Sequence, residues 1–202
     1  MKKKIFLGLI CCLLVLGVFT GCGKTSNDSP VEILSENKLN WTSLNISLDD
    51  NNYQYPLRVV NFIENGWIAF SSEDEQKLNK MVESNDGYNF VTLKKGGLLV
   101  YIYVDNQVSN ISVRDSNVVN FSISKEVENC STSFEVDGFK VGSVATKSEI
   151  ESKFGIKNYE ILSDEKFYTY HYYKELDNLK VQLEIVTNIK TNEIIKISLS
   201  NY

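Results

Sequence analysis

Few side chains in this sequence could carry out chemistry. The one histidine, His171, lies in the aromatic run 167–173. A Ser-His-Asp or Cys-His catalytic device would have to use it, and no nucleophile-elbow motif accompanies it. We therefore interpret His171 as a packing or surface residue of a strand. One histidine and one cysteine beyond residue 22 are too few for the usual zinc ligands, so we expect no metal site and no cofactor.

Carboxylates are plentiful, and paired carboxylates could perform acid–base work or bind calcium. The calcium-loop spacing is absent, which favours solvated turns and helix caps. The candidates are Asp49-Asp50, the run 73–75, Glu126 and Glu128.

The four cysteines do not form a disulfide framework. Cys11 and Cys12 lie in an apolar leader, and Cys22 follows it directly. Cys130 is then the single cysteine of the folded part, which predicts no internal disulfide. We interpret Cys130 as a buried small hydrophobic residue, with a reactive free thiol as the alternative.

The leader has the three parts of a secretory signal. Lys2, Lys3 and Lys4 form a positive start, 5–19 is an apolar run, and small residues precede Cys22. The apolar run of 15 residues is shorter than the roughly 20 that a spanning helix needs. A cleaved signal peptide of residues 1–21 is therefore predicted.

The end of the leader, Phe19-Thr20-Gly21-Cys22, resembles the bacterial lipobox, although Phe19 departs from the usual leucine. The resemblance implies cleavage between Gly21 and Cys22 and lipid attachment at Cys22, with acyl chains that hold the protein on the outer face of a cell membrane. An ordinary signal peptide with a chance cysteine is the alternative.

Composition fits a folded extracytoplasmic protein. Hydrophobic residues make up 43% and charged residues 23%, which argues against wholesale disorder. Removing residues 1–21 leaves 181 residues and takes away three lysines and no acid, which changes the formal charge from −5 to −8. Such an acidic chain is a poor general binder of nucleic acid, so no nucleic-acid partner is expected.

The pattern beyond the leader predicts an α+β fold of mostly antiparallel sheet with two or three short helices. Residues 22–40 are polar and predict a flexible lipidated tether. Hairpins are expected near 42–55 and 133–141. Helices are expected at 57–65, from Ser72 to about 82, and at 147–154. Capping boxes are expected to begin the last two, with Ser72 and Thr146 as N-caps and Glu75 and Glu149 as their partners. The remaining strands are expected near 67–70, 88–93, 98–104, 108–113, 118–124, 159–162, 166–173, 179–186 and 193–200.

The order of these elements suggests two tandem repeats. Each contains a hairpin, a short helix ending at Gly66 or Gly155, and a strand meander, with an offset of about 80 to 90 residues. This predicts a first α+β module at 41–125 and a second at 126–202. The alternative is that hairpin-helix-meander order is common in α+β proteins.

The stretch 142–155, with a Gly-led turn and a helix ending in Phe154-Gly155, resembles an element of β-lactamase-inhibitor-like modules and of small outer-membrane assembly lipoproteins. Residues 52–56 with Gly66-Trp67 resemble lipoproteins of Gram-positive bacteria whose function is uncharacterised. The resemblance implies protein binding through a sheet face, although fold does not determine function.

Tyrosines are the best candidates for a contact surface, because they bury a large area and carry a polar tip. Alternation along the strand from Lys166 puts three of them on one face, and two more follow Val100. The candidate partner-binding residues are Tyr101, Tyr103, Tyr168, Tyr170 and Tyr172. The alternative is that these tyrosines cover a half-buried sheet.

These observations favour a non-catalytic, membrane-anchored module that binds another surface protein or an envelope component. An envelope assembly or maintenance factor is a second hypothesis. A surface hydrolase that uses a carboxylate pair is a third.

Overall fold

The folded part of the chain is a set of antiparallel sheets with short helices, the α+β class that the sequence predicts. The computed structural model describes residues 44–82, 89–105, 110–155, 162–163, 166–176 and 179–201. They belong to one compact unit that spans residues 35–202. The expected modules 41–125 and 126–202 both contribute strands to each of the two sheets.

The smaller sheet joins the two predicted hairpins in the order β2-β1-β7-β8. Its strands are β1 (Asn45–Leu48), β2 (Asn51–Gln54), β7 (Phe134–Val136) and β8 (Phe139–Lys140). Each hairpin has a two-residue turn whose first residue has a positive φ, 52° at Asp49 and 49° at Asp137. Aspartate tolerates this left-handed conformation better than most residues, which explains the turns.

The larger sheet has eight strands in the order β3-β4-β5-β6-β12-β11-β10-β9. Its strands are β3 (Ile68–Ala69), β4 (Phe90–Lys95), β5 (Leu98–Val104), β6 (Val118–Lys125), β9 (Leu162–Ser163), β10 (Phe167–Leu176), β11 (Leu179–Asn188) and β12 (Ile194–Asn201). The predicted strand at 108–113 is wrong for the residues described there, because Val113–Asp115 form a 3-10 turn, η1. Ser112 begins this turn by accepting a hydrogen bond from the Asp115 N–H.

The two sheets are symmetric in strand order. If each of β1–β6 is replaced by the strand six positions later in the chain, and the reverse, each order becomes its own mirror image. The bonds between β1 and β7 follow the same exchange. Asp49 N donates to Ser133 O at 2.8 Å, and Asp137 N donates to Asn45 O at 2.9 Å. Ser133 N donates to Asp49 Oδ1 at 2.8 Å, and Asn45 N donates to Asp137 Oδ1 at 3.2 Å. The two halves therefore meet in a reciprocal arrangement.

Three short helices are described: α2 (Val59–Glu64), α3 (Ser72–Leu78) and α4 (Lys147–Phe154). The predicted capping box at Thr146 and Glu149 is confirmed. Helix α3 differs from the prediction, because Ser71 rather than Ser72 is its N-cap and Asp74 is the partner residue. It also ends at Leu78, short of the predicted 82.

Asp74 explains the start of α3 and protects the exposed edge of β4. Its carboxylate accepts from Ser71 Oγ at 2.6 Å and from the Thr92 N–H at 3.0 Å. Phe70 N donates to Thr92 O at 2.9 Å. Both backbone groups of Thr92, just beyond the two-residue β3, are thus paired, which blunts an edge that could otherwise recruit another strand.

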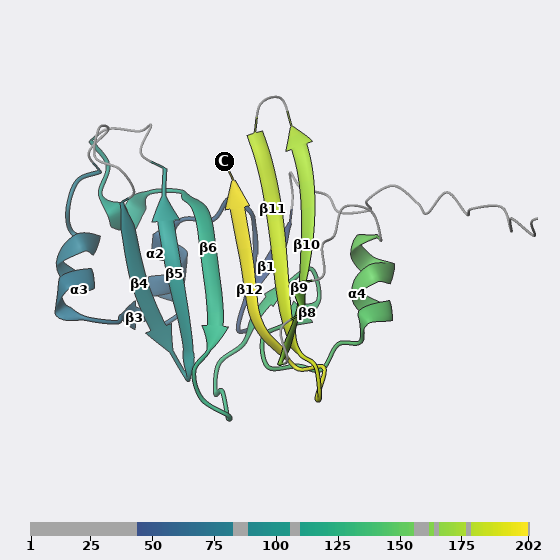
Figure 1. Ribbon diagram of the computed structural model, residues 1–202. Helices are drawn as coiled ribbons and strands as arrows, with labels where there is room; N and C mark the ends of the chain where they lie inside the picture. Colours follow the sequence, from purple (N-terminus) through teal and green to yellow (C-terminus); the bar gives the residue numbers. More distant parts are fainter. Residues whose placement is uncertain are drawn as a thin grey trace, which may run out of the picture. The chain divides into compact units, whose positions relative to one another are not determined.

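The core lies between the two sheets and the helices. Phe134 of β7 packs on Phe62 of α2 at 6.4 Å and on Phe121 of β6 at 5.3 Å between ring centroids. In the second half, Phe154 of α4 packs on Tyr172 of β10 at 5.4 Å. Figure 1 shows α2, β1 and β8 behind the eight-stranded sheet, with α3 beyond one end and α4 beyond the other. None of these helices covers the opposite side of that sheet, which we call the outer face.

Candidate functional site

The outer face carries a row of outward side chains that crosses five strands. Register pairs Tyr101 with Ser122, Ser122 with Ser198, Ser198 with Glu184, and Glu184 with His171. Because side chains alternate along a strand, these five residues point to the same side. The row changes from aromatic to hydroxyl to charged as it passes from the first half of the chain to the second.

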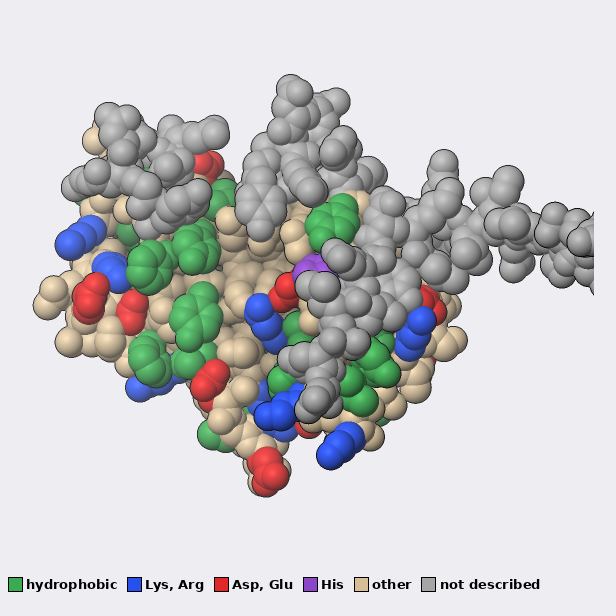
Figure 2. Space-filling model, viewed as in Figure 1, with side chains coloured by type: hydrophobic (Ala, Val, Ile, Leu, Met, Phe, Trp, Pro, Cys, Tyr) green, Lys and Arg blue, Asp and Glu red, His purple; other side chains and the backbone are tan. Residues whose placement is uncertain are grey.

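The first-half end of the outer face is apolar. Four large side chains are strongly exposed there: Ile68 by 59%, Phe70 by 50%, Phe90 by 42% and Tyr101 by 43%. With Leu99 and Tyr103 we call them the aromatic patch. Figure 2 shows hydrophobic side chains gathered over this part of the molecule, with few charged groups between them.

Contacts within and around the aromatic patch hold its rings in place. The Phe90 and Tyr103 rings lie 5.9 Å apart at an interplanar angle of 40°. Lys77 Nζ lies 4.1 Å from the centre of the Phe90 ring, and Lys94 Nζ lies 5.4 Å from that of Phe70. These cation–π contacts leave much of each ring exposed.

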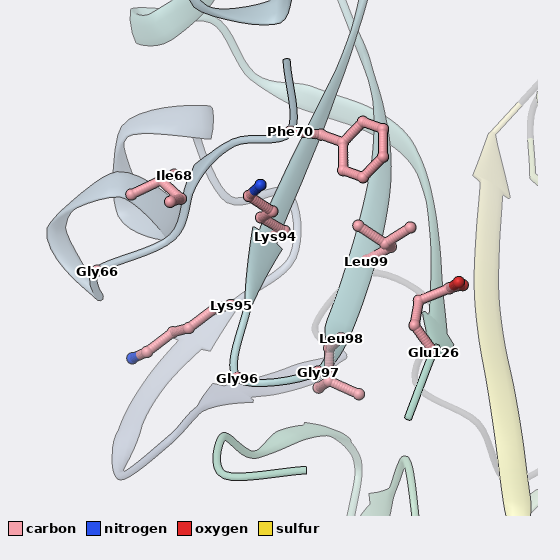
Figure 3. A pocket seen from close by; sticks show the side chains of 10 residues that line it. All are labelled: Gly66, Ile68, Phe70, Lys94, Lys95, Gly96, Gly97, Leu98, Leu99 and Glu126. Carbon is pink, nitrogen blue, oxygen red and sulfur yellow. The ribbon is translucent and has the colours of Figure 1, made fainter. Parts of the chain in front are cut away.

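A hollow of about 510 Å³ adjoins the aromatic patch beside the turn between β4 and β5. Ile68, Phe70, Lys94 and Leu99 contribute side chains to its lining, and Figure 3 shows the Phe70 and Leu99 side chains directed to the same side. Such volumes are typical of sites that accept a small ligand or an anchoring side chain.

Glycine is required at this turn. Gly97 has a φ of 90°, and a Cβ atom placed there would lie 2.3 Å from Val127 Cγ2. The left-handed φ of Gly97 therefore favours glycine at this position, where the chain beyond β6 passes close to the turn.

A second hollow, of about 410 Å³, lies across the middle of the outer face, and we call it the polar groove. Its lining is Tyr103, Asn120, Phe121, Ser122, Gln182, Glu184, Lys196, Ser198 and Ser200. These residues come from β5, β6, β12 and β11, so the polar groove spans the junction of the two halves of the chain.

Among the described residues that line the polar groove, Glu184 is the one carboxylate, and cationic or polar groups surround it. Lys196 Nζ lies 2.8 Å from Glu184 Oε1, and His171 Nδ1 lies 3.6 Å from Glu184 Oε2. Gln182 Nε2 lies 2.9 Å from His171 Nδ1. Ser198 Oγ donates to Ser122 Oγ at 3.0 Å.

His171 is a packed strand residue, as the sequence suggests. It is 8% exposed, and its ring stacks on Tyr173 with centroids 6.1 Å apart. Its Nε2 atom is buried without a hydrogen-bond partner. Within the described part of the chain, the polar contacts of the ring are to Gln182 and Glu184.

The five tyrosines predicted to contact a partner lie on two different faces of the eight-stranded sheet. Tyr168, Tyr170 and Tyr172 do share a face of β10, but it is the inner one: Tyr170 is 2% and Tyr172 0% exposed, and Tyr168 packs against the core. The prediction that these three tyrosines form an exposed contact surface is wrong. Their rings instead supply the core-facing side of β10. Tyr101 and Tyr103 lie on the outer face.

The carboxylates outside the polar groove serve turns, caps and surface ion pairs. Glu73 pairs with Lys77 at 3.0 Å, and Glu75 lies 3.8 Å from Arg114. Glu126 accepts from Ser124 Oγ. Among the described residues, no group of three or more His, Cys, Asp or Glu is placed to hold a metal ion.

Asp49 anchors a polar network between the hairpins and the β4–β5 turn. Lys95 Nζ donates to Asp49 Oδ2 and to Asn65 O, both at 2.5 Å, and Thr132 Oγ1 donates to Asp49 Oδ1 at 2.6 Å. Burial raises the Asp49 pKa, but hydrogen bonds from Lys95, Thr132 and Ser133 outweigh it and lower the pKa below its ordinary value. This network joins elements rather than forming a ligand site.

Cys130 is half-buried and unpaired in the part of the chain that the structure describes. Its Sγ lies 3.7 Å from Gly97 O and 3.6 Å from Val127 O. Burial raises the pKa of its thiol, which disfavours the nucleophilic thiolate. This environment agrees with the interpretation as a small packing residue.

Gly21 and Cys22, the predicted cleavage and lipid-attachment residues, and the tether 22–40 lie outside the described residues. Within the ranges that are described, no helix has the length and apolarity needed to cross a membrane. Comparisons with protein-family models, with curated proteins and with solved structures gave no match for this chain.

Sequence reasoning missed most of the outer face. Ile68, Phe70 and Phe90 lie in short apolar stretches that do not show which side chains are exposed, and Gln182 and Glu184 resemble ordinary polar positions of a strand. One feature of the sequence could have indicated the outer face: the positions of β10 that alternate with the three tyrosines, which include His171 and Tyr173. Only the observed register shows that this set lies beside Glu184.

Proposed function

We propose that this protein is a non-catalytic binding module, anchored by acyl chains on Cys22 to the extracytoplasmic face of a cell membrane, that contacts its partner through the outer face. The partner is another surface protein or an envelope component. The anchor is supported by the leader and the lipobox-like end at Gly21-Cys22. The binding role is supported by one structural observation, the aromatic patch.

The aromatic patch supports binding because its exposed apolar residues gather in one place. Single exposed hydrophobic residues are ordinary on a soluble protein, whereas a contiguous group marks an interaction site. Two phenylalanines and two tyrosines supply the large, stiff side chains that dominate binding energy at interfaces. The adjoining hollow offers a place for an anchoring group of the partner.

The residue types of the outer face favour binding over catalysis. The polar groove contains one carboxylate, Glu184, which is paired with Lys196. His171 is largely buried, and its ring contacts Gln182 and Glu184. These arrangements hold charges in fixed pairs rather than presenting an activated nucleophile or an acid–base couple.

The test is to follow partner capture by the full chain in the membranes of its own cells. We expect cross-linking to recover at least one specific partner, and Phe70→Ala with Tyr101→Ala to reduce recovery by about tenfold, the consequence of losing roughly 1.4 kcal/mol of binding free energy. Val144→Ala is the matched control, since Val144 is a 66% exposed apolar residue outside the aromatic patch. Equal recovery by both variants would reject the aromatic patch as the binding surface.

We further propose that the two halves of the domain are structural repeats. The support is the mirrored strand order and the reciprocal bonds of Asp49 and Asp137, which are 88 residues apart. The N-caps of α2 and α4, Arg58 and Thr146, have the same offset. Helix α3 and η1 are additions to the first half.

A further inference from the structure

We propose that the polar groove binds a neutral oligosaccharide, with Tyr103 and Tyr101 as the aromatic surface on which a sugar ring stacks. This inference rests on the proposed function, since it assumes that the outer face is the binding face, and it names the chemical class of the envelope component.

The lining of the polar groove matches the groups of a sugar. Sugar hydroxyls both donate and accept hydrogen bonds, as do the hydroxyls of Ser122, Ser198 and Ser200 and the amide of Gln182. Adjacent strands are about 4.8 Å apart, so a linear ligand lying across β6, β12 and β11 meets an outward polar side chain at each strand. The volume of about 410 Å³ is within the range of sites for small ligands.

The charges of the polar groove favour an uncharged ligand. Glu184 is balanced by Lys196 at 2.8 Å, so the groove offers neither an isolated cation nor an isolated anion. The chain without residues 1–21 carries a formal charge of −8, which repels anionic polymers. Neutral hydroxyl-rich chains avoid this repulsion and still use the hydrogen-bonding side chains.

Two tyrosines provide the apolar part of the site. Tyr103 lines the polar groove, where its ring is supported by Phe90 at 5.9 Å, and Tyr101 is 43% exposed opposite Ser122. The C–H face of a sugar ring is apolar and gains from burial against such a ring. With Glu184 as the groove's one carboxylate, the site retains a glycan without cleaving it.

The test uses the full chain in detergent micelles and isothermal titration with tetrasaccharides of N-acetylglucosamine, glucose and mannose. We expect at least one to bind, with affinity lowered about tenfold by Tyr103→Ala and by Gln182→Ala, equivalent to roughly 1.4 kcal/mol each. Tyr103→Phe keeps the ring and should retain most of the affinity. Val144→Ala, at an exposed residue that lines neither the polar groove nor the aromatic patch, should bind as the unchanged protein does. Circular dichroism checks that each variant is folded.

Three outcomes would overturn the inference. If no tetrasaccharide binds at millimolar concentration while partner capture still depends on Phe70 and Tyr101, the glycan inference fails and the proposed function stands. If sugars bind equally to folded Tyr103→Ala and Gln182→Ala variants, the polar groove is the wrong site. If a sulfated polysaccharide binds more tightly than the neutral sugars and is released by salt, the ligand is not neutral. Loss of both sugar binding and patch-dependent capture would reject the proposed function as well.

Discussion

The first and second halves of the domain have the same strand order, yet they present different chemistry on the outer face. In the first half, Phe90, Tyr101 and Tyr103 face outward. In the second half, the corresponding face carries Glu184 and Lys196 as a pair. The inner faces, in contrast, are apolar in both halves. The core therefore limits what the inward positions can be, while the outward positions are where the halves differ.

The comparison predicts that the halves unfold together. Phe134 lies where they meet, with rings of α2 and β6 on either side. We expect Phe134→Ala to lower the free energy of unfolding by about 4 kcal/mol, because it leaves a cavity among packed rings. Urea denaturation followed by tryptophan fluorescence and by circular dichroism should give one shared transition in both proteins. Separate transitions would mean that the halves are independent domains despite their shared sheets.

Asp49 and Asp137 allow a finer test, since they occupy equivalent hairpin turns. We expect Asp49→Asn to cost about 2 kcal/mol, because Lys95 loses its ionised partner in a half-buried network. Asp137→Asn should cost less than about 1 kcal/mol, because its bonds to Asn45 are exposed. Urea denaturation of each variant at pH 7 measures both values, and equal losses would contradict the distinction.

The cost of Asp49→Asn should also depend on pH. The pKa of Asp49 is lowered in the folded protein from the ordinary value of 3.8. Its contribution to stability is therefore fully present well above pH 3.8 and is lost as the pH falls through the folded pKa. The stability gap between the unchanged protein and Asp49→Asn should narrow below about pH 4, whereas a constant gap would assign the effect to something other than ionisation.

A smaller difference separates the helices at equivalent positions. The Thr146 side chain accepts from Glu149 N, whereas Arg58, its counterpart on α2, makes no side-chain cap bond. We expect Thr146→Ala to destabilise the protein by about 1 kcal/mol and Thr146→Ser to cost much less. Thermal unfolding of both variants checks this, and an equal loss for serine would indicate that the threonine methyl group rather than the cap matters.

The local rules of the sequence were sufficient for much of the fold. Asp137-Gly138 and the Thr146–Glu149 box produce their turn and helix through bonds between near neighbours, so sequence spacing locates them. The cap of α3 was misplaced by one residue because Ser71 and Ser72 both precede an acidic residue by three positions, and the long-range bond from Thr92 N to Asp74 favours the pair Ser71 and Asp74.

The candidate site was harder to predict for the same reason. Alternation correctly grouped Tyr168, Tyr170 and Tyr172, but alternation alone does not say which face is buried. That choice depends on the other layer, where Phe154 of α4 packs against Tyr172. The polar groove combines side chains from β5, β6, β12 and β11, and only the junction of the two halves brings them together.

The smallest expected change in stability is at Tyr101. Because its ring is 43% exposed and lies outside the core, Tyr101→Ala should change the free energy of unfolding by less than about 0.5 kcal/mol. The same substitution should weaken partner capture severalfold, whereas Tyr101→Phe should preserve most of it, since the ring supplies the buried area. Measuring unfolding and capture on the same preparations separates the two roles of the sheet. A stability loss of several kcal/mol would place Tyr101 with the inward tyrosines, and the contrast between the two faces would then not hold.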